Sequence, residues 1–117
     1  MKDYLKIGIV AGEHSGDILG ENLLKSLKKI KNVEIYGVGG PRMESQGLKS
    51  SFDFNKLNIM GLVDPIINYS KIMSYKNDLC DLFINKKIDI FIGVDSPDFN
   101  MQIQKKLKKN SEIKTVQ

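Results

Sequence analysis

IFIGVDSPDFN, residues 90–100, joins a short apolar run to two carboxylates set around a proline. The apolar run predicts a buried parallel strand, followed by a turn from Asp95 to Asp98. Pro97 cannot donate to a sheet ladder, so the strand must end before it. Ligands of open α/β sheets bind just outside the carboxyl ends of the strands, which makes this turn a candidate site.

Asp98 in this turn has two interpretations. It falls at the start of the following helix, where an aspartate commonly does no more than cap backbone N–H groups. Its position at the carboxyl end of a strand instead favours a role in chemistry. The stretch alone leaves both interpretations open.

A second turn follows the first predicted strand, Lys6 to Ala11. Its sequence, AGEHSGD at residues 11–17, leads into a helical pattern of leucine and isoleucine. Gly12 and Gly16 allow close approach of a ligand, while Ser15 and Asp17 are predicted to cap the helix. The spacing matches neither the G-x-G-x-x-G dinucleotide fingerprint nor a P-loop.

Strands and helices alternate through the first half of the chain. Strands are predicted at residues 33–38 and, more weakly and near a sheet edge, at 49–54, with a short helix beginning at Pro41 and Gly47 as its C-cap. This alternation predicts an α/β domain with a doubly wound, mostly parallel, Rossmann-like sheet.

Apolar residues between Ile59 and Lys87 recur at helical spacing, and Pro65 places the helix start near Leu62. The first half of this helix is apolar over more than one stripe, so part of it should stay uncovered by the sheet. It packs on a neighbouring domain, fills the core, or forms an exposed, lipid-facing patch.

The last third predicts a strand at 89–94, a basic helix at 100–109 and a strand at 113–116, inside which the chain stops. Parallel strands are normally followed by a crossover helix, so we expect residues 1–117 to be a truncated domain.

Composition excludes several classes of function. Of 117 residues, only Cys80 is a cysteine and only His14 a histidine, which argues against a disulfide, a zinc enzyme and a Cys–His nucleophile pair. The net charge of +4 is spread along the chain without interleaved aromatic residues, so no nucleic-acid partner is expected. The apolar run near Met1 is too short for a secretory signal, and no segment of this sequence approaches the length that spans a bilayer, so we expect a cytoplasmic protein.

Four segments resemble the N-terminal part of the lipid-A-disaccharide synthase family. They are IVAGEHSGDILG at 9–20, YGVGGPRMESQG at 36–47, IMGLVDPI at 59–66 and FIGVDSPDFN at 91–100, in the family's order and spacing. The resemblance implies the N-terminal, acceptor-side domain of a GT-B type glycosyltransferase, without its C-terminal donor domain and therefore inactive alone.

The resemblance implies an inverting hexosyltransferase without cofactor or metal. The 6-hydroxyl of 2,3-diacylglucosamine 1-phosphate would attack the anomeric carbon of UDP-2,3-diacylglucosamine, giving lipid A disaccharide 1-phosphate and UDP. Asp98 is then the candidate catalytic base. Substrate-binding residues would be Gly12, Glu13, Ser15, Gly16 and Asp17, which shape the cleft, and Asn100, which orients Asp98 or the sugar.

The same resemblance gives the apolar helix a purpose, because both substrates carry acyl chains. It implies a surface for lipid tails or the inner membrane, formed by Met60, Leu62, Val63, Ile66, Ile67 and Met73, with Lys56, Lys71 and Lys76 near anionic head groups. The protein would be cytoplasmic and peripheral to the inner membrane, with a possible homo-oligomer formed through the C-terminal domain.

Two other readings stay open. One is a stand-alone nucleotide- or lipid-binding module of flavodoxin-like topology, which affinity for a flavin or nucleotide would favour. The other is a degenerate fragment, for which poor solubility and no ligand response would speak.

Overall fold

A computed structural model describes residues 4–53, 69–95 and 97–116. Within these ranges the chain forms a parallel sheet in the order β3-β2-β1-β4-β5. The strands are β1 (Tyr4–Val10), β2 (Asn32–Val38), β3 (Lys49–Ser50), β4 (Ile90–Gly93) and β5 (Lys114–Val116). The helices are α1 (His14–Ile30), α2 (Pro41–Glu44), α4 (Tyr69–Asn85) and α5 (Pro97–Asn110). The predicted doubly wound α/β fold is confirmed.

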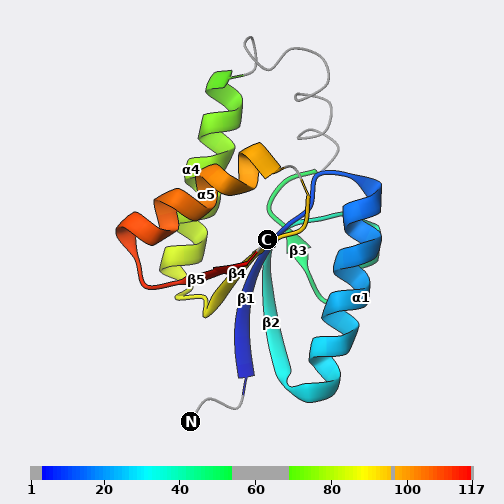
Figure 1. Cartoon of the computed structure of the whole chain (residues 1–117). Helices are drawn as coiled ribbons and strands as arrows, with labels where there is room; N and C mark the ends of the chain where they lie inside the picture. Colours follow the sequence, from blue (N-terminus) through cyan, green and yellow to red (C-terminus); the bar gives the residue numbers. More distant parts are fainter. Residues whose placement is uncertain (1–3, 54–68, 96, 117) are drawn as a thin grey trace.

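Helices cover both faces of the sheet, with α1 on one side and α4 and α5 on the other (Figure 1). Two buried clusters follow from this arrangement. Ile7 and Ile9 of β1 pack in one cluster with Leu24 of α1, while Val10 packs in the other with Phe83 of α4. Successive strand residues point to opposite faces, so a continuous apolar run such as β1 supplies both cores.

Gly37 in β2 shows how closely the central strands approach each other. Its φ is +137°, and a Cβ there would lie 1.9 Å from the carbonyl oxygen of Ile9. Only glycine fits this backbone position without moving β2 away from β1. The pairing of β1 with β2, in register from Tyr4↔Asn32 to Val10↔Val38, therefore depends on it.

The third strand is shorter than the predicted 49–54. Its ladder with β2 pairs Lys49 and Ser50, and the N–H of Ser51 still donates to the carbonyl of Gly37 at 2.8 Å. Phe52 then packs its ring against Tyr75 of α4, with centroids 4.2 Å apart. The predicted edge position is confirmed, because β3 is the outermost strand beside β2.

Two helix boundaries also differ from prediction. The predicted caps of α1 are wrong: the N-cap is Glu13, and its own side chain makes no capping hydrogen bond. The last helix begins at Pro97 and not at Asn100, which suits proline because the first turn needs no N–H donor. The predicted start of the long helix near Leu62 lies outside the described residues, whereas α4 ends at Asn85.

Candidate active site

The turns after β1 and β4 lie side by side at the carboxyl edge of the sheet. β1 pairs with β4 from Ile7↔Ile90 to Val10↔Gly93, and β2 flanks β1 on its other side. The strand order therefore reverses direction between β1 and β4, which is the topological switch point where α/β proteins bind ligands. The stretch 11–17 and the turn that begins at Val94 meet at this point.

Asp95 joins the two turns through its carboxylate. Oδ1 accepts the N–H of Gly12 at 2.6 Å, and Oδ2 accepts the N–H of Glu13 at 2.9 Å. Gly16 lies against the same carboxylate, since a Cβ at Gly16 would be 2.1 Å from Oδ2. Hydrogen bonds between a carboxylate and backbone N–H groups at a helix start are charge-assisted and favoured by the helix dipole.

Asn100 supports the Asp95 turn from inside the protein. Its side chain is fully buried, and Nδ2 donates to the carbonyl oxygens of Asp95 and Val10, the latter at 3.4 Å. Gly93 provides the space, because a Cβ there would lie 2.9 Å from Cβ of Asn100. Oδ1 of Asn100 has no hydrogen-bond partner within the described ranges. Asn100 therefore ties the first turn of α5 to the ends of β1 and β4.

Asp17 joins α1 to α2. It is 2% exposed, and its carboxylate accepts the backbone N–H groups of Gly40, Arg42 and Met43, each at 3.0 Å. Gly40 is the N-cap of α2, so Asp17 caps a helix other than its own. A salt bridge of 3.2 Å between Arg42 and Glu21 lies beside this contact.

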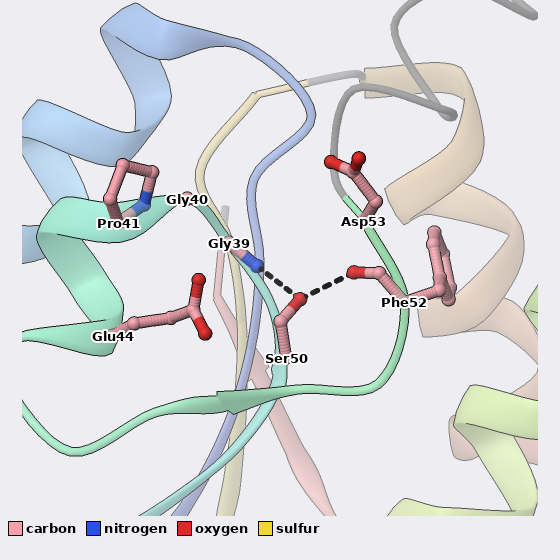
Figure 2. A pocket seen from close by; sticks show the side chains of 7 residues that line it. All are labelled: Gly39, Gly40, Pro41, Glu44, Ser50, Phe52 and Asp53. Carbon is pink, nitrogen blue, oxygen red and sulfur yellow. Dashed lines mark hydrogen bonds between the residues drawn. The ribbon is translucent and has the colours of Figure 1, made fainter.

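A pocket of about 340 Å³ opens at the carboxyl ends of β2 and β3. Figure 2 shows Ser50 at its centre, where Oγ accepts the N–H of Gly39 at 3.2 Å and donates to the carbonyl of Phe52 at 2.6 Å. Carboxylates of Glu44 and Asp53 also line it. Sequence reasoning missed this pocket, because its residues come from two segments, 39–44 and 50–53, and only the parallel pairing of β2 with β3 brings them together.

Comparison with known proteins identifies the family. The sequence model of the family described as "Lipid-A-disaccharide synthetase" matches residues 7–116. The chain belongs to this family. The matched range includes both turns at the switch point, the buried clusters and every described helix.

Curated relatives of the lipid-A-disaccharide synthetase family agree with this assignment. The lipid-A-disaccharide synthase of Aliivibrio salmonicida is 48% identical over 117 residues, which are 99% of this chain and 30% of the relative. The one from Pseudoalteromonas translucida is 46% identical over 114 residues, which are 97% of this chain and 29% of the relative. That of Blochmanniella pennsylvanica is 45% identical over 111 residues, 94% of this chain and 28% of the relative. The chain thus spans less than a third of the length of these family members.

Most of the site residues expected for this family gather at the switch point. Gly12 and Gly16 are buried there, and Glu13 and Ser15 are exposed. Asp98 is the second residue of α5, directly after the Asp95 turn. The carboxylate of Asp17 binds the N-terminus of α2, and the amide of Asn100 donates to backbone carbonyls at the ends of β1 and β4. Both residues therefore have structural roles, and their predicted roles in substrate binding stay predictions.

The structure describes only one residue of the predicted lipid surface. Met73 lies half-buried on α4, and the others lie outside the described residues, namely Met60, Leu62, Val63, Ile66 and Ile67. No helix within the described ranges has the length and apolar content to cross a bilayer. The same ranges contain no cluster of three or more His, Cys, Asp or Glu side chains suited to a metal ion.

Proposed function

We propose that this chain forms the acceptor-side domain of a GT-B glycosyltransferase that makes lipid A disaccharide 1-phosphate. The donor would be UDP-2,3-diacylglucosamine and the acceptor 2,3-diacylglucosamine 1-phosphate. The contact of Asp95 with Gly12 and Glu13 carries the proposal, because it holds the two family motifs against each other at the switch point. Family membership and relatives named lipid-A-disaccharide synthase support the choice of reaction.

In this reaction Asp98 acts as the general base. Its carboxylate takes the proton of the acceptor 6-hydroxyl while that oxygen attacks the anomeric carbon of the donor. The new C–O bond forms on one face of the sugar as the bond to UDP breaks on the other, so the configuration inverts. UDP leaves with the electron pair and needs electrostatic stabilisation, which we assign to a donor domain in the rest of the enzyme.

The pocket beside Ser50 suits part of the acceptor. It lies at the carboxyl ends of strands β2 and β3, at the same edge as Glu13 and Asp98, because all strands run parallel. Its carboxylate and hydroxyl oxygens can receive hydrogen bonds from sugar hydroxyl groups. We place the sugar ring of the acceptor between this pocket and the start of α5.

A chimera tests the proposed reaction. Residues 1–117 of this protein would replace the matching segment of the Aliivibrio salmonicida relative, with which they share 48% identity. Disaccharide formation from the two acylated substrates is the expected result, with no turnover by the 117-residue chain alone. A folded chimera without turnover, or an isolated chain that binds flavin or nucleotide tightly, would favour the binding-module alternative.

We also propose that the apolar residues between Met60 and Met73 meet the inner membrane. Lys71 and Lys76 on α4 would contact anionic head groups, each contributing about 1 kcal/mol near a charged surface. Serine substitutions at Val63, Ile66 and Met73 should weaken cosedimentation of the chimera with anionic vesicles. Ile30→Ser is the matched control, because Ile30 is an 81% exposed apolar residue at the far end of α1. If vesicle binding is unchanged, these residues pack against another domain and do not meet the membrane. A homo-oligomer formed through the C-terminal domain would then be tested separately.

A further inference from the structure

The backbone N–H groups that lead into α1 already bind an anion, the side-chain carboxylate of Asp95. The N-terminal N–H groups of a long helix attract phosphates in many nucleotide-binding α/β folds. Here the N–H groups of Gly12 and Glu13, which lead into the 17 residues of α1, both donate to the carboxylate of Asp95. A phosphate could reach these two groups only by displacing Asp95.

The surroundings of Asp95 hold the carboxylate in this place. Gly16 leaves open the space in which Oδ2 lies, since a Cβ there would approach it to 2.1 Å. On the backbone side, buried Asn100 donates to the carbonyl oxygen of Asp95. The residue is therefore fixed at both its side chain and its main chain, and α5 is tied to α1 through it.

The charge at this edge also opposes a phosphate. Glu13 lies exposed next to the contact. Together with Asp95 it places negative charge around the point where the two turns meet. A neutral hydroxyl group meets no such repulsion, and a carboxylate can accept its proton in a hydrogen bond.

We propose that Asp95 is a positioning residue that acts as an internal anion. It sets the Glu13 backbone and the start of α5 relative to each other, and it keeps phosphate groups away from the start of α1. This edge is thereby reserved for the acceptor hydroxyl, while both phosphate-bearing parts of the substrates bind elsewhere. The assignment of the hydroxyl rests on the proposed function; the exclusion of phosphate does not.

Inorganic phosphate is the probe that tests whether Asp95 excludes phosphate from the start of α1. We expect the amide resonances of Gly12 and Glu13 in the 117-residue chain to stay unmoved by millimolar phosphate, and to shift saturably in Asp95→Ala. Asp89→Ala is the matched control, because Asp89 accepts the N–H of Lys6 at 2.9 Å at the opposite end of the β1–β4 pair. It should gain no phosphate binding at Gly12. Saturable binding by the unsubstituted chain at these amides, or none by folded Asp95→Ala, would overturn the exclusion.

Asp95→Asn tests the positioning role of Asp95, and it replaces Asp95→Ala in the experiment if that variant does not fold. Its amide is nearly isosteric but offers one acceptor oxygen, so hydrogen exchange at Gly12 or Glu13 should become faster. In the chimera the substitution should lower kcat by about 10- to 100-fold with a smaller change in the acceptor KM. Unchanged amide exchange, or unchanged kcat in an active chimera, contradicts the positioning role. A chimera that is inactive without any substitution rejects the proposed function, and the phosphate and exchange results still decide the role of Asp95.

Discussion

Gly16 and Asp95 lie so close together that a Cβ on Gly16 would be 2.1 Å from Oδ2 of Asp95. Gly16→Ala should therefore push the carboxylate away from Gly12 and Glu13 and lower the free energy of unfolding by about 1 to 3 kcal/mol. Urea unfolding followed by circular dichroism measures the loss. In an Asp95→Ala background the same substitution should cost clearly less, because the clash is gone. Additive losses in the double variant would show that the two residues do not interact.

The sequence alone could not predict which residue contacts Gly16. A glycine in a turn before a helix indicates close approach of some group, and a bound ligand is the usual expectation. The group is Asp95, brought there by the parallel pairing of β1 with β4. Sequence places two acids around Pro97 and cannot tell which of them faces the first turn, because that depends on how the chain leaves β4.

Asp17 is predicted to matter for stability. Its carboxylate accepts three backbone N–H groups at the start of α2, so Asp17→Ala leaves buried donors without a partner. We expect a loss of about 2 to 3 kcal/mol in the free energy of unfolding. Glu44→Gln, at an exposed position of α2, should change stability by less than about 0.5 kcal/mol. Thermal unfolding of both variants compares them, and equal midpoints would refute the capping role of Asp17.

The sheet could be predicted from the sequence, whereas the capping role of Asp17 could not. Apolar runs such as those of β1 and β4 determine the buried strands by local composition, and the alternation with helices restricts the topology. Asp17 looks like an ordinary acidic residue of a first helical turn, where the helix dipole favours it. Its partners follow β2, so only the tertiary arrangement shows that it caps α2.

Stability should fall at alkaline pH partly through Cys80. The thiol is fully buried on α4, and burial raises the pKa of Cys80 above its ordinary value. Below the unfolded pKa of about 8.5 the thiol is protonated in both states and has no effect on the pH dependence. Above it the unfolded state loses the proton first, so the free energy of unfolding falls as the pH rises from about 8.5 to 9.5.

Cys80→Ala isolates this contribution, because tyrosines and lysines titrate in both proteins. The difference in unfolding free energy between the two proteins should shrink as the pH rises through this window. Chemical denaturation at several pH values gives both curves. Parallel curves would mean that Cys80 ionises equally easily in the folded and unfolded states.

Asp98→Asn distinguishes a catalytic base from a residue that only stabilises the helix. Asp98 is the second residue of α5, where the helix dipole favours a carboxylate. Asparagine keeps the size of the side chain, but its amide cannot take a proton. In the active chimera we expect kcat to fall by about 10² to 10⁴-fold, while the lost dipole interaction should lower the free energy of unfolding by less than about 1 kcal/mol. Asp98→Ser should lose turnover to a similar extent, because serine is no general base near neutral pH. Glu112→Gln, an exposed substitution in the loop before β5, should leave turnover unchanged. If Asp98→Asn and Asp98→Ser keep near-wild-type turnover, then Asp98 only stabilises the start of α5 and the base must be sought among the other carboxylates at this edge, beginning with Glu13.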